Sequence, residues 1–191
     1  MVELILGLAV FLGVHSISIF ANPWRDRIVA QIGRPAWQGL YSVAALIGLV
    51  LIVYGYAAAR AEPVFLYVPP LWLRHTAMLL MVVVFPLLLA AYLPGRIRAA
   101  TKHPMLVGVK TWAFAHLLAN GTLADVLLFG AFLAWAVIDR ISLRRRPSRA
   151  TPAASAGRWN DAIAVVGGLA IYLLLVLGGH AWLTGMPLVL P

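Results

Sequence analysis

Long apolar runs separated by short, arginine-rich polar stretches dominate the chain. The runs are continuous and show no alternation with a period of two, which favours helices over strands. At about 1.5 Å of rise per residue, roughly 20 residues cross a hydrocarbon core of about 30 Å. We therefore predict an all-α fold in one domain, 1–191, a polytopic integral membrane bundle of six transmembrane helices. The predicted spans are Val2–Ala21, Trp37–Ala59, Leu71–Leu93, Pro104–Ala119, Thr122–Ile138 and Ala162–Thr184.

Composition supports a membrane protein and excludes several kinds of chemistry. Hydrophobic residues make up 63% of the chain and charged residues 11%, which is unlike a soluble domain. Only helices and closed barrels satisfy every backbone N–H and C=O inside a bilayer. The chain has no cysteine, so disulfides, thiolate ligands and iron–sulfur clusters are excluded. Paired carboxylates for glycosidase, protease or di-iron chemistry are also absent from the spans.

The positive charge is concentrated in alternate loops. The first, third and fifth loops hold 12 of the 15 Lys and Arg residues. The positive-inside rule places these loops in the cytoplasm and both termini on the other side. We therefore attribute the net charge of +9 to basic residues that set the orientation of the chain in the lipid bilayer. We predict no binding of nucleic acid. Segment 144–161 is predicted to be a flexible basic cytoplasmic linker between helices five and six.

Two local patterns concern single helices. Pro86 falls inside the third predicted span and should kink it, because proline lacks the N–H that the helix needs. Thr122 and Asp125 match the T-x-x-D pattern of a capping box ahead of the fifth apolar run. This explanation accounts for Asp125 without a functional role.

Histidines provide the main chemical signal, because all five lie within or at the edge of predicted spans. They are His15, His75, His103, His116 and His180. Histidine is the commonest metal ligand, and polar side chains in a bilayer are costly enough to suggest function. A membrane metal or haem site is therefore one hypothesis. The alternative is that each imidazole makes a hydrogen bond across helices or lies at headgroup level.

Two of the histidines lie deepest in the predicted spans. His15 is about 9 Å, and His116 about 18 Å, from the cytoplasmic boundary by helical rise. This difference in depth opposes their pairing on one haem unless the short hairpin around Asn120 lies closer to the cytoplasm. Trp112, His116 and Asn120 follow one helical stripe, which fits a pocket wall and a packed interhelical contact equally well. His103 begins the fourth run and should be interfacial.

The chain resembles the NnrU family of bacterial membrane proteins over essentially its whole length. The resemblance rests on GVHS around His15, on NPWR and WQGLY in and after the first loop, and on KHP followed by WAFAHLLANG. It implies a bacterial inner-membrane protein associated with denitrification, the metabolism of nitrite and nitric oxide. A related family, the 15-cis-zeta-carotene isomerases, uses haem b, and its ligand histidines match His15 and His116, with His103 also aligned. Ala113 stands where the plant enzyme has a cysteine.

Three functions remain open at this point. The first is a haem b protein of nitrogen-oxide metabolism with His15 and His116 as iron ligands and Trp112, Asn120 and His103 at the cofactor. The second is a haem-dependent cis–trans isomerase of a carotenoid-like lipophilic molecule. The third is a membrane scaffold or assembly factor for a respiratory reductase. The sequence identifies no catalytic residue.

Overall fold

The computed structural model describes residues 1–146 and 153–188. Within them the regular structure is helical apart from one isolated β-bridge between Phe65 and Thr122. The described chain forms two compact units. Unit 1 comprises Met1–Pro69 and Asn120–Arg146, and unit 2 comprises Pro70–Ala119 and the described residues from 153 onward.

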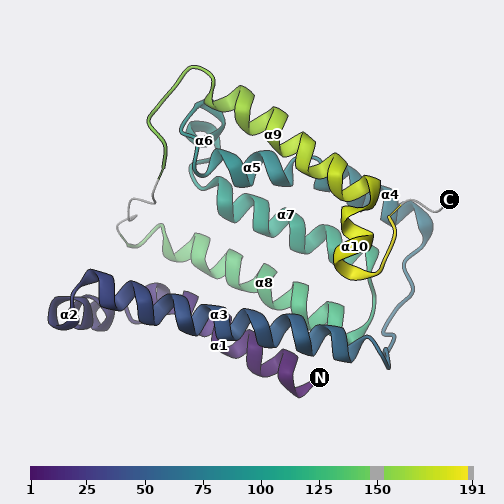
Figure 1. The fold of residues 1–191 in the computed structure, drawn as a ribbon, viewed down its shortest axis with the longest axis horizontal. Coiled ribbons are helices and arrows are strands. Elements are labelled where there is room, and N and C mark those ends of the chain that lie inside the picture. The colour runs from purple at the N-terminus through teal and green to yellow at the C-terminus, as the bar shows by residue number, and fades with distance from the viewer. Residues whose placement is uncertain (147–152, 189–191) are drawn as a thin grey trace. The chain divides into compact units, whose positions relative to one another are not determined.

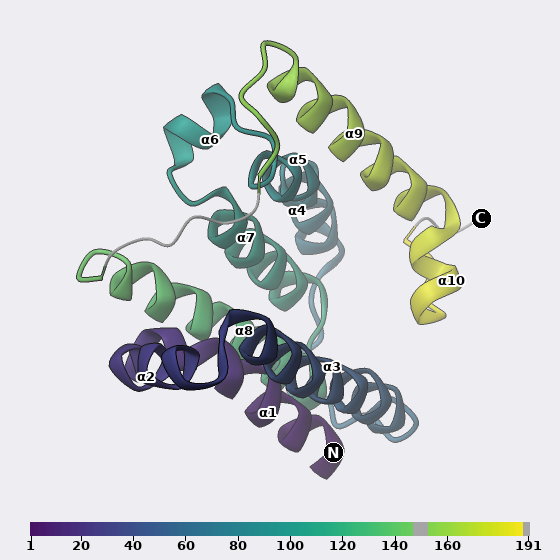
Figure 2. The same cartoon turned by 60° about the vertical axis from the view of Figure 1, so that its left-hand side comes forward.

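Unit 1 is built on a closely packed helix pair. Its helices are α1 (Val2–Phe20), α2 (Asn22–Ile32), α3 (Arg34–Ala59) and α8 (Leu123–Ser142). Helices α1 and α3 run side by side in Figures 1 and 2, and α8 packs against α1. Glycines allow the close approach: a Cβ added to Gly55 would lie 2.2 Å from the backbone nitrogen of Leu4, and one on Gly48 would lie 2.7 Å from that of Phe11. Small residues at a membrane helix interface have this effect because they let the backbones touch.

Unit 2 packs its helices around α5. The elements are α4 (Leu71–Met81), α5 (Val84–Ala90), α6 (Arg96–Thr101), α7 (Pro104–Ala119), α9 (Asn160–Leu174), the π-helical η1 (Leu175–Gly179) and α10 (His180–Thr184). Helix α5 contacts α7 and α9 and lies between them in Figure 1, and α4 contacts α7. Gly168 of α9 lies against Pro86 of α5, where an added Cβ would be 2.3 Å from the proline nitrogen.

Proline interrupts the third predicted span as expected. Helix α4 ends at Met81 and α5 begins at Val84, with Val82 and Val83 between them in a turn. Pro86 has no N–H to donate to the carbonyl of Val82, and its ring crowds that carbonyl. The predicted kink is confirmed.

The structure supports four of the six predicted spans by length and composition, so six spans are not confirmed. The four are Val2–Phe20, Arg34–Ala59, Leu71–Ala90 and Asn160–Thr184. Helix α7 is apolar but has only 16 residues. Helix α8 has 20 residues, but every 18-residue stretch of it includes Asp125, Asp139 and Arg140. Charges at both ends of α8 therefore leave it with a shorter uninterrupted apolar length than the sequence prediction assumed.

Two short helices lie in regions that the sequence analysis treated as loops. They are α2 and α6. The carboxylate of Asp161 accepts hydrogen bonds from the backbone N–H of Arg96 at 2.8 Å and of Ile97 at 3.1 Å, which caps α6 from the start of α9. The amide of Asn160 donates to the carbonyl of Pro94 at 2.8 Å. Two adjacent side chains thus hold the beginning of α9 against α6.

Part of the predicted basic linker lies outside the described residues. Its described residues 153–157 have no helix or strand, but the N–H of Ala154 donates to the carbonyl of Tyr92 at 2.9 Å. At the other end, Arg146 is paired with Asp139 of α8 and donates to the hydroxyl of Ser142. Both described ends of the linker are therefore attached to helices or turns of their own unit.

Candidate functional site

His15 lies in α1 with one ring nitrogen already bound. Its Nδ1 is 2.7 Å from the carbonyl oxygen of Phe11, four residues earlier in the same helix. A carbonyl oxygen only accepts hydrogen bonds, so Nδ1 must carry the proton and donate. In the neutral ring Nε2 is then the nitrogen with the lone pair, which is the state that a metal requires.

Aromatic side chains from α1, α3 and α8 surround the His15 ring. Phe11 stacks on it at a centroid distance of 4.3 Å. Tyr41 and Trp135 meet it edge-on at 5.3 and 5.9 Å. Phe132 extends this aromatic cluster through its contact with Phe11 at 5.7 Å. These rings hold the imidazole in an apolar environment and restrict its rotation.

Trp135 adds a feature that the sequence analysis missed. Its indole Nε1 is buried and has no hydrogen-bond partner among the described residues. A buried donor without a partner costs about 1–3 kcal/mol, and native proteins rarely leave one. A tryptophan in an apolar helix gives no sequence signal of this kind, because only the packed structure shows that its N–H is buried.

His116 repeats the arrangement of His15 in unit 2. Its Nδ1 is 2.8 Å from the carbonyl oxygen of Trp112, again four residues earlier in the same helix. The Trp112 and His116 rings have centroids 5.3 Å apart and an interplanar angle of 53°. The i, i+4 spacing that the sequence showed does bring these two side chains together. The fully buried Ala113 and Ala115 lie between them in the sequence.

The other two predicted site residues lie just outside the two ends of α7. His103 immediately precedes the helix, and Asn120 immediately follows it. His103 is thirteen positions from His116, or about 20 Å by helical rise, so α7 does not bring the two together. His15 belongs to unit 1 and His116 to unit 2, and each is described here in its own surroundings.

The two remaining histidines have simpler environments. His75 is exposed on α4, and His180 Nδ1 contacts the carbonyl of Met186 at 2.8 Å and the hydroxyl of Thr184 at 3.2 Å. Across the described ranges, no group of three or more His, Asp or Glu side chains is placed to hold a metal ion.

Comparison with known protein families agrees with the sequence motifs around the two helix-bonded histidines. The NnrU protein family model matches residues 3–188. The chain belongs to the NnrU family. Neither the curated proteins nor the solved structures contain a match to this NnrU protein.

A buried carboxylate forms the second polar cluster of this NnrU protein. Asp125 is 5% exposed and accepts hydrogen bonds from the backbone N–H of Thr122 at 3.0 Å, from the Thr122 hydroxyl at 2.6 Å and from the Tyr56 hydroxyl at 2.5 Å. The Thr122 hydroxyl in turn accepts from the Asp125 N–H, so the predicted capping box is confirmed. Tyr56 was missed because it lies 69 positions away in the chain. With three donors bound, the carboxylate links α3 to α8.

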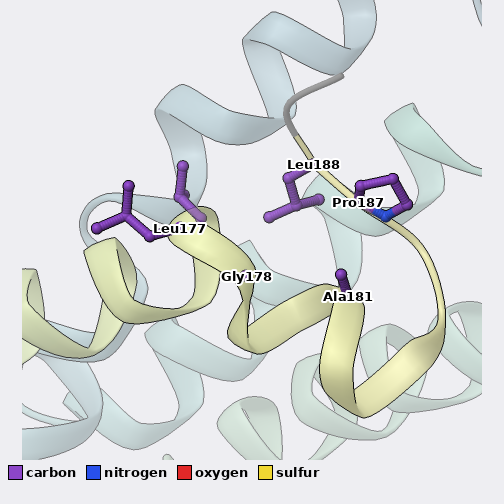
Figure 3. A pocket seen from close by; sticks show the side chains of 6 residues that line it. Leu177, Gly178, Ala181, Pro187 and Leu188 are labelled. Carbon is purple, nitrogen blue, oxygen red and sulfur yellow. The ribbon is translucent and has the colours of Figure 1, made fainter. Parts of the chain in front are cut away.

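The NnrU chain also has an apolar cavity near its C-terminus. It has a volume of about 390 Å³ and lies beside the kink between η1 and α10. Figure 3 shows the side chains that line it. Gly178 forms the kink with a φ of 145°, a conformation that favours glycine. None of the described residues that line the cavity has a titratable side chain. The lining residues are Val176, Leu177, Gly178, Ala181, Pro187 and Leu188.

Proposed function

We propose that this NnrU protein binds haem b in the membrane, with His15 and His116 as the iron ligands, and acts in nitrogen-oxide metabolism. The observation that carries the proposal is that both imidazoles make the same kind of hydrogen bond. Each Nδ1 donates to the backbone carbonyl four residues earlier. Metal-binding histidines almost always donate their second ring nitrogen in this way, because the bond fixes the tautomer and makes Nε2 a better ligand.

The surroundings of both imidazoles suit a flat, largely apolar macrocycle. His15 is enclosed by Phe11, Tyr41 and Trp135, and His116 lies against Trp112. Such rings exclude water, and burial of this kind is one means by which a protein tunes a haem iron. Bound haem supplies one-electron chemistry and an iron that binds nitric oxide. The residues of this chain would fix the ligand orientation, exclude water and set the polarity around the group.

The proposal extends to two residues at the ends of α7. Asn120 and His103 flank the helix and are proposed as cofactor-binding residues, His103 on the family resemblance and Asn120 because it follows His116 on the same helical stripe.

We further propose a bacterial inner-membrane location with both termini outside the cytoplasm. The four apolar helices and the uneven distribution of Arg and Lys among the loops support this topology. A respiratory reductase of nitrogen-oxide metabolism is the proposed partner.

The experiment is an absorption spectrum of the detergent-purified protein from haem-replete cells, oxidised and then reduced with dithionite. We expect a Soret band and, on reduction, the sharp α and β bands of a low-spin b-type haem. His15→Ala and His116→Ala should each change the spectrum if both imidazoles reach the same iron. The matched control is His75→Ala, which removes an exposed imidazole from α4 and should change nothing.

Each other outcome points to a specific alternative. A flat visible spectrum that haem reconstitution does not change would refute haem binding, and copurification with a reductase subunit would then favour a scaffold. Loss of the spectrum in only one of the two variants would leave a single protein ligand. If haem binds, conversion of a carotenoid in a host that lacks the isomerase would assign isomerase activity instead.

A further inference from the structure

The unsatisfied donor beside His15 calls for an acceptor that the described residues do not supply. The Nε1–H of Trp135 is buried without a partner, and indole is a donor only. The imidazole of His15 lies beside it, with ring centroids 5.9 Å apart and the ring planes at 90°. The Nδ1 of His15 is already bound to Phe11. Phe11 and Phe132 provide only apolar rings in this cluster, and the hydroxyl of Tyr41, which also contacts His15, makes no hydrogen bond to the indole.

Haem binding, on which this inference rests, limits the acceptor further. If Nε2 of His15 coordinates iron, its lone pair is used and cannot accept from the indole. The four pyrrole nitrogens of a haem also bind the iron. The propionate carboxylates are then the strong hydrogen-bond acceptors that haem b itself carries. The haem that His15 binds would therefore supply the acceptor for the indole N–H of Trp135.

Positive charge at and just after the C-terminal end of α8 favours a carboxylate near Trp135. Trp135 precedes Arg140 by five residues, and α8 leads directly into Arg144, Arg145 and Arg146. Asp139 is the acidic residue of this segment, and it is paired with Arg146. The helix end therefore carries an excess of positive charge, which stabilises an anion near it.

We propose that the indole N–H of Trp135 donates a hydrogen bond to a propionate carboxylate of the haem held by His15. Trp135 is thus a cofactor-binding residue that recognises a propionate side chain of the haem, while His15 binds the iron. Hydrogen bonds to charged groups are strong enough that loss of this one should weaken haem binding roughly ten- to a hundredfold.

The test compares two probes on the wild type and two variants. Full-length protein is purified from haem-deficient cells and titrated in one detergent with ferric haem b or with its dimethyl ester, which has no carboxylate charge. Trp135→Phe removes the N–H but keeps an aromatic ring. We expect it to weaken the binding of haem roughly ten- to a hundredfold while leaving the binding of the ester nearly unchanged. Trp182→Phe is the control, because Trp182 is 85% exposed, and it should match the wild type with both probes.

The outcomes separate this inference from the proposed function. Equal weakening of haem and ester by Trp135→Phe, or no weakening of either, would overturn the hydrogen bond to the propionate while haem binding stands. A wild type that binds neither probe would overturn both. If Trp135→Phe binds neither probe and has lost helical structure, 3-benzothienyl-alanine at position 135 repeats the comparison, because it replaces the N–H with sulfur at nearly constant shape.

Discussion

Replacing Tyr56 by phenylalanine tests the link between α3 and α8 most directly. The Tyr56 hydroxyl donates to Oδ1 of Asp125 at 2.5 Å, while both Thr122 donors bind Oδ2. Tyr56→Phe therefore removes one of the three donors and leaves the capping box in place. The aromatic ring, which packs on Phe129 at a centroid distance of 6.5 Å, is retained.

The size of the effect follows from the burial and charge of the acceptor. A hydrogen bond to a charged group contributes about 1.5–3 kcal/mol, and Asp125 is 5% exposed, so water cannot readily replace the lost donor. We expect Tyr56→Phe to lower the free energy of unfolding by about 1.5–3 kcal/mol. Asp125→Ala should lower the free energy of unfolding further, because it also removes the helix cap, worth about 1 kcal/mol, and leaves the part-buried Tyr56 hydroxyl without this acceptor.

The assay is reversible unfolding in mixed micelles, in which sodium dodecyl sulfate is titrated and far-ultraviolet circular dichroism is followed. Tyr54→Phe is a matched control on the same helix, since Tyr54 is 67% exposed. In the Asp125→Ala background, Tyr56→Phe should lower the free energy of unfolding little further, because the acceptor of its hydroxyl is already gone. If Tyr56→Phe and Tyr54→Phe unfold at the same detergent fraction, the reasoning about this carboxylate is wrong.

Two further predictions use the same unfolding assay. Gly55→Ala should destabilise the protein by about 1–3 kcal/mol, because its Cβ would lie 2.2 Å from the backbone nitrogen of Leu4. Gly39→Ala, in the same helix with no atom within 4 Å of an added Cβ, should be neutral or stabilising by up to about 1 kcal/mol; equal effects would contradict the close α1–α3 packing. Asp161→Ala removes both acceptors that cap α6 and should cost about 1–3 kcal/mol. Unchanged stability and unchanged amide exchange at Arg96 would show that the cap is not needed.

Features that depend on neighbouring residues were predictable from the sequence. The apolar runs predicted helices because length and hydropathy are local properties, and four of the runs are long and apolar enough to span. Pro86 predicted a break because its missing N–H acts within one helical turn. Thr122 and Asp125 predicted a capping box, and Trp112 and His116 predicted a shared helix face, because three or four residues separate each pair.

Contacts between distant parts of the chain were decided by the tertiary structure alone. Tyr56 reaches Asp125 across 69 positions, and Arg96 reaches Asp161 across 65, and neither pair has a local pattern that could reveal it. The burial of the Trp135 N–H beside His15 likewise depends on how α8 packs on α1. Hydropathy and helical periodicity say which face of a helix is buried. They do not say which partner buries it, because the energy of that choice comes from shape and hydrogen bonding between surfaces that only the folded chain brings together.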